Sequence, residues 1–71
     1  MGPIRSRLLK YFYEHQGRKV TTFELEEQLK IDFSTIKGMI EILRWEGFVE
    51  QTFGTCATIT PKGIDEVRKY R

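Results

Sequence analysis

Five residues that commonly begin or end secondary structure divide this sequence into short segments: Thr22, Ser34, Gly47, Gly54 and Thr60. Threonine and serine favour the N-cap position of a helix, and glycine commonly ends a helix or forms a tight turn. The short interval between Thr22 and Ser34 leaves room for one brief helix and a turn before the next helix begins. These boundaries predict a fold that is built from short elements.

Apolar residues at helical spacing locate three helices before Gly47. The first is expected over residues 3–16, with Pro3 in its first turn and Gly17 ending it. The second follows Thr22 as its N-cap. Its apolar contacts are expected from Phe23, Leu25 and Leu29. The third is expected over residues 34–46, with Ser34 as its N-cap. Its buried face is expected to hold Ile36, Met39, Ile40 and Leu43.

The sequence pattern changes after Gly47. Residues 48–53 and 55–60 are rich in valine, isoleucine, threonine and phenylalanine, with Gly54 between them, which predicts a β-hairpin over residues 48–60. A last helix follows, with Thr60 as its N-cap and Pro61 at its first position. The expected order is helix, short strand, helix, helix, strand, strand and helix. Residues 1–71 are therefore expected to form a single domain of the α+β class.

Four segments in this order resemble the winged helix-turn-helix family, as found in bacterial and archaeal transcriptional regulators. They are residues 20–25, 31–36, 43–49 and 59–63. The resemblance implies a small winged helix-turn-helix fold, with a three-helix core, a two- or three-stranded β-wing and a C-terminal helix. It also implies that residues 34–46 form a recognition helix in the major groove of double-stranded DNA. The hairpin would then lie against the DNA backbone or the minor groove.

The residues expected to contact DNA lie on the exposed face of this helix, at the start of the preceding helix and in the wing. They are Thr22, Ser34, Thr35, Lys37, Gly38, Glu41, Arg44, Thr52 and Thr55. Hydroxyl and ammonium groups near a helix start suit phosphates, and a glutamate can accept from cytosine N4. The face holds little positive charge, because similar proteins often carry basic or long polar residues where this chain has Gly38 and Ile42. Lys37 and Arg44 are DNA contacts or ordinary solvated charges, and Gly38 permits close approach or is merely tolerated.

Composition limits the other functions. Twelve Lys and Arg residues against ten Asp and Glu give a formal charge of +2, which permits DNA binding without demonstrating it. Cys56 and His15 are the single residues of their types, so no intramolecular disulfide or cysteine-based zinc site is expected. We expect no cofactor, no metal and no small-molecule site. Catalysis is not expected either, because the carboxylates have no matching nucleophile, histidine or phosphate-binding loop. The absence of a long apolar run or secretory signal predicts a cytoplasmic protein without a membrane partner.

Apolar residues beyond the needs of a small core predict a homodimer through the first and last helices. They are Leu9, Tyr13, Val67 and Tyr70. Trp45 is expected to lie half-buried under the wing, with an exposed anchor for a partner as the alternative. Phe53 either folds over the core or docks into a partner. The leading functional prediction is therefore a sequence-specific, homodimeric transcriptional regulator, and the alternative is a winged-helix protein–protein interaction module without DNA binding.

Overall fold

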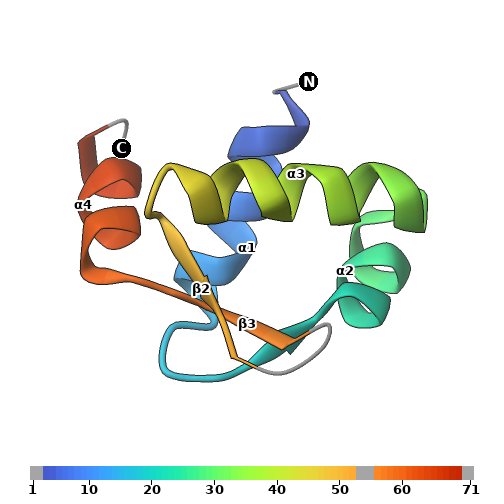
Figure 1. The fold of residues 1–71 in the computed structure, drawn as a ribbon, viewed down its shortest axis with the longest axis horizontal. Coiled ribbons are helices and arrows are strands. Elements are labelled where there is room, and N and C mark those ends of the chain that lie inside the picture. Colours follow the sequence, from blue (N-terminus) through green and yellow to red (C-terminus); the bar gives the residue numbers. More distant parts are fainter. Residues whose placement is uncertain (1–2, 53–55, 70–71) are drawn as a thin grey trace.

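The computed structural model describes residues 3–52 and 56–69, and Figure 1 shows its helices and strands in the predicted order. Their bounds are α1 (Ile4–Glu14), β1 (Val20–Thr21), α2 (Thr22–Leu29), α3 (Phe33–Trp45), β2 (Val49–Gln51), β3 (Cys56–Ile59) and α4 (Pro61–Lys69). This architecture confirms the α+β fold class. In the part of the chain that is described, no helix is both long enough and apolar enough to cross a bilayer.

The three strands form one antiparallel sheet in the order β1-β3-β2. Val49 pairs with Ile59 in the β2–β3 hairpin, and Val20 pairs with Ala57 where β1 joins the other edge of β3. The hairpin was predicted over residues 48–60, and both of its strands lie within those bounds. The short strand that was expected between the first two helices is β1, which pairs with β3 and makes the sheet three-stranded.

The core lies between the sheet and helices α1, α2 and α3. Its buried apolar side chains are Leu8, Leu9, Phe12, Val20, Leu25, Ile36, Ile40, Leu43, Phe48, Val49, Ala57 and Ile59. The predicted inner face of α3 is confirmed, because Ile36, Ile40 and Leu43 are buried and Met39 packs against them. Phe23 was expected to make core contacts, but 62% of it is exposed and its ring lies against Phe33.

The caps of α2 and α3 differ from the predicted ones. The N-cap of α2 is Thr21, whose hydroxyl accepts a hydrogen bond from the Glu24 N–H at 3.0 Å. The N-cap of α3 is Asp32, whose carboxylate accepts from the Thr35 N–H at 2.9 Å and from its hydroxyl at 3.0 Å. The backbone N–H of Thr35 is the main cause of a lowered pKa at Asp32. Thr22 and Ser34, predicted as these caps, therefore lie inside the helices.

The predicted cap of α4 is confirmed. The Thr60 hydroxyl accepts from the Gly63 N–H at 3.1 Å and donates to the Gly47 carbonyl at 2.6 Å. Gly63 is needed for this packing, because a Cβ atom there would lie 2.2 Å from the Phe48 carbonyl oxygen. The start of α4 is thereby held against the chain that leaves α3 and enters the hairpin.

Candidate nucleic-acid interface

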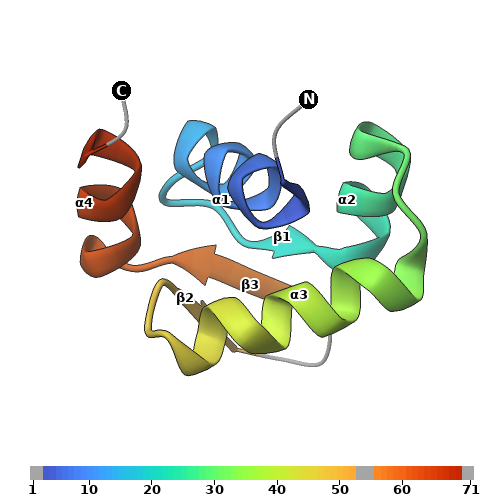
Figure 2. The same cartoon turned by 90° about the horizontal axis from the view of Figure 1, so that it is seen from above.

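Helix α3 lies along the outside of the domain. Figure 1 shows it crossing the molecule with the hairpin leaving from its C-terminal end, and Figure 2 shows α1 on the far side of it. Its 13 residues span about 20 Å at the usual rise of an α-helix. The exposed residues on this helix are Ser34, Thr35, Lys37, Gly38, Glu41, Ile42, Arg44 and Trp45. All of the DNA-contact residues that were predicted on this helix therefore reach solvent together.

The charged side chains of this face are few. Arg44 donates to Glu41 at 2.9 Å, and both side chains are 52% exposed. This ion pair leaves the two charges accessible, since an exposed pair is only weakly held. Lys37 is exposed on the same side of the helix. Gly38 lies between Lys37 and Glu41 in the sequence, and a Cβ atom added there would meet nothing within 4 Å. The helix backbone is therefore directly approachable at Gly38.

Large apolar side chains also reach solvent on α3. Trp45 was expected to be half-buried under the wing, but it is 90% exposed, and Ile42 is 50% exposed. The reason is the helical period: Trp45 lies about 200° around the axis from Leu43, which points into the core. The chain then turns at Gly47, and Phe48 is the aromatic residue that it buries. The alternative of an exposed anchor is the one that agrees with the structure.

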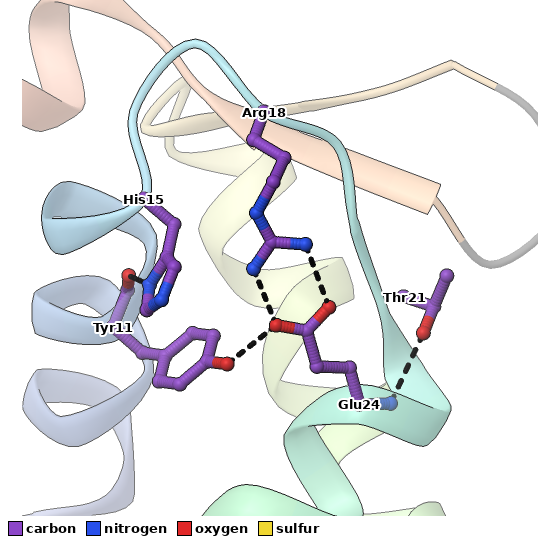
Figure 3. A network of polar contacts seen from close by, with 5 residues as sticks. All are labelled: Tyr11, His15, Arg18, Thr21 and Glu24. Atoms are coloured by element: carbon purple, nitrogen blue, oxygen red, sulfur yellow. Dashed lines mark hydrogen bonds and ion pairs between the residues drawn. The ribbon is translucent and has the colours of Figure 1, made fainter.

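A polar network fixes the first turn of α2 against α1 (Figure 3). Arg18 donates through two nitrogens to the Glu24 carboxylate, and the Tyr11 hydroxyl donates to the same carboxylate. These donors, Arg18 first, lower the pKa of Glu24 to about 2. The His15 ring stacks on Tyr11 with 4.2 Å between centroids, and its Nδ1 lies 2.9 Å from the Tyr11 carbonyl oxygen. The network holds α1, the following loop and α2 together, and so positions the helix that precedes α3.

The three DNA contacts that were predicted outside α3 differ in their exposure or lie outside the described residues. Thr22 is only 3% exposed, so its side chain does not form part of an open surface. Thr52 is exposed next to the end of β2, where its N–H donates to the Cys56 carbonyl. Thr55, Phe53 and the hairpin tip lie outside the described residues. The described contact surface therefore consists of α3 and Thr52.

A groove of about 700 Å³ runs between α1 and α4, where no small-molecule site was expected. Its lining includes the apolar Leu9, Tyr13 and Val67 and the charged Lys10, Glu14 and Glu66. Leu9 was predicted as dimer surface, but at 4% exposed it belongs to the core, because α1 turns it toward the other helices. Tyr13 and Val67 are partly buried against the core, and Tyr70 lies outside the described residues. Among described residues, no group of three potential ligand side chains is placed to hold a metal ion.

Thr35 and Gly38 were expected contacts, Ile42 was compared only with basic residues of similar proteins, and Trp45 was not assigned to the site. The signal was present, because Thr35, Gly38, Ile42 and Trp45 recur at intervals of three, four and three residues. Such spacing places side chains along one side of a helix. Reading the side opposite Leu43 as a continuous surface would have found them.

Known structures identify the fold. No protein-family model matches the sequence, and no curated protein matches it significantly. Solved structures with a similar fold include MepR, a transcription regulator of the Staphylococcus aureus multidrug efflux pump MepA, at a TM-score of 0.84 and 18% identity over 93% of this chain and 52% of that one. They also include the heme sensor protein PefR from Streptococcus agalactiae, solved in complex with heme, at a TM-score of 0.79 and 17% identity over 93% of this chain and 49% of that one. This chain thus has the winged helix-turn-helix fold and spans about half the length of these structures.

Proposed function

We propose that this domain binds double-stranded DNA through α3 and acts as the DNA-reading part of a transcriptional regulator. The observation that carries the proposal is the exposure of one whole side of α3 in a winged-helix fold. A major groove about 12 Å wide admits a helix of this size. The similarity in fold to a transcription regulator supports the same role.

The proposed contacts divide along the helix. Ser34 and Lys37 lie in its first turns, where hydroxyl and ammonium groups suit phosphate oxygens. Arg44 lies further along, with a guanidinium whose fork matches the O6 and N7 atoms of guanine. Glu41 accepts from that guanidinium in an exposed ion pair, and its carboxylate can also accept from cytosine N4. Thr52 and Thr55 complete the set from the wing, whereas Thr22 is withdrawn because it is buried.

A homodimer would use α1 and α4. The groove between these helices leaves Tyr13 and Val67 partly accessible, and it carries both signs of charge on Lys10 and Glu66. A two-fold axis places the same surface opposite itself, so opposite charges within one patch can pair across it. Two copies related in this way would present their α3 helices to sites about one turn of DNA apart.

The exposed Trp45 favours a second candidate function, that of a protein-interaction module. Exposed aromatic residues are common anchors of protein interfaces, where they fill a pocket on the partner. In that case α3 would carry few charged side chains because its partner presents an apolar surface.

The test of the proposal is Lys37→Ala, measured by fluorescence anisotropy with labelled duplexes of several sequences. If Lys37 neutralises a phosphate, affinity falls for all duplexes alike; if it reaches a guanine edge, the loss is about 1–3 kcal/mol and confined to sites with that base. Lys19→Ala is the matched control, because it removes the same charge from an exposed lysine between α1 and β1, outside α3 and outside the proposed dimer helices, and it should leave affinity unchanged. Unchanged affinity for both Lys37→Ala and Arg44→Ala in folded protein would reject α3 as the reader.

A further inference from the structure

The exposed apolar residues of α3 form a continuous surface, which we call the apolar strip: Thr35, Gly38, Ile42 and Trp45. At about 100° per residue, the four positions fall within about 80° of the helix circumference. Trp45 and Gly38 lie about 20–40° from the direction opposite Leu43, and Ile42 and Thr35 lie about 80–100° from it. The edge of the strip formed by Trp45 and Gly38 therefore lies where α3 would enter a groove most deeply, and the rest of the strip faces one wall of the groove.

The two large side chains of the apolar strip are not part of the core. Trp45 is 90% exposed and Ile42 is 50% exposed, so most of their apolar surface remains in water. Gly38 sits between them and Thr35, and nothing in the protein would meet a Cβ atom there. A glycine inside a helix is unfavourable by roughly 1 kcal/mol relative to alanine, and no contact in the fold explains it. The combination leaves a notch beside two large apolar side chains.

The flanks of the strip indicate what it faces. Lys37 and Arg44 lie on one flank, where Arg44 donates to Glu41 at 2.9 Å. Cations beside an apolar strip complement a ligand that is anionic at its edges and apolar at its centre. The major groove of DNA has this character wherever thymine occurs, because phosphates border the groove and the thymine C5-methyl group projects into it.

We propose that the apolar strip reads C5-methyl groups of pyrimidines in the major groove, with Ile42 and Trp45 packing on the methyl groups and Gly38 allowing their close approach. This inference rests on the proposed function and adds the chemical class of its target. From Gly38 to Trp45 the helix advances about 10 Å, so the strip reaches only a few consecutive base pairs. Apolar contacts of this kind explain why α3 carries so few bidentate donors.

The test changes the DNA and leaves the protein as it is. Duplexes are first selected from a random-sequence pool, and the best one is then remade with deoxyuridine in place of thymidine, which removes only the methyl groups. A buried methyl is worth about 0.8 kcal/mol, or about fourfold in affinity, so losing one or two contacts should weaken binding about 4- to 15-fold. The emission of Trp45, the single tryptophan of the chain, should also shift with the thymine duplex and shift less with the uracil duplex.

A protein variant and a second base complete the experiment. Ile42→Ser should discriminate less between the thymine and uracil duplexes than the unaltered protein, because only Trp45 still contacts a methyl group, and circular dichroism would confirm that the variant is folded. A gain for 5-methylcytosine over cytosine at the contacted positions would assign the strip to the methyl group on either base, and no gain would assign it to thymine alone. Equal affinity of the unaltered protein for thymine and uracil duplexes would overturn the inference while leaving DNA binding in place. If the pool yields no bound duplex, the proposed function itself fails, and this inference falls with it.

Discussion

Replacing Gly38 with alanine should make the domain more stable and a poorer DNA binder. The added methyl group meets nothing within 4 Å, and the φ angle of Gly38 is not positive, so alanine fits without strain. Alanine in place of a glycine inside a helix is worth about 0.5–1 kcal/mol. For a domain of this size, 1 kcal/mol shifts Tm by about 4–8 °C, so the expected rise is about 2–8 °C.

Thermal unfolding followed by circular dichroism at 222 nm would measure this rise, and urea unfolding would check it at constant temperature. The same protein should bind its selected duplex more weakly, because the new methyl group fills the notch of the apolar strip. A lower or unchanged Tm would refute the claim that this side of α3 is open. A higher Tm with unchanged DNA affinity would refute the close approach at Gly38 and leave the stability reasoning intact.

Three further predictions concern the fold. Gly63→Ala should lower Tm, because the new Cβ atom would lie 2.2 Å from the Phe48 carbonyl oxygen. Overpacking of this kind commonly costs about 1–3 kcal/mol of stability. An unchanged Tm would show that α4 can shift freely. Thr60→Val should cost about 0.5–2 kcal/mol in urea unfolding through loss of the helix cap, and an effect near zero would mean that the cap hydrogen bonds contribute little. Glu24→Gln should be less stable than the unaltered protein at neutral pH, and the difference should shrink as pH falls from 4.5 toward 2, because the folded-state pKa of Glu24 is lowered to about 2. A difference that stays constant over that range would argue against its ion pair.

Much of the fold was predictable because the spacing of apolar residues agrees with the positions of the residues that begin or end helices and turns. The spacing of Ile36, Ile40 and Leu43 predicted the buried face of α3, and the change of pattern after Gly47 predicted the hairpin. The caps were less predictable, because neighbouring residues compete for the position. Thr21 stands next to Thr22 with the same hydroxyl, and the sequence alone does not say which one precedes the first helical turn.

In the candidate site, too, some features were predictable from the sequence and others were not. The exposed side of α3 follows from the helical period, so Lys37 and Arg44 could be placed on it without a structure. The helical period also places Trp45 on this side, but whether the hairpin covers its side chain depends on the path that the chain takes after the helix ends. The contacts of Arg18 and Tyr11 with Glu24 also depend on how separate elements pack in three dimensions, and sequence spacing carries no information on them.

The central claim is that α3 binds a polyanionic duplex, and salt dependence tests it most directly. The affinity for the selected duplex should be measured by anisotropy at several salt concentrations between about 50 and 200 mM. The account predicts a linear fall of log affinity with log salt, with a slope of about −0.9 for each phosphate neutralised, and a slope reduced by about one unit in Lys37→Ala. An affinity that does not change with salt would contradict DNA binding through this face and would support docking of an apolar protein partner instead.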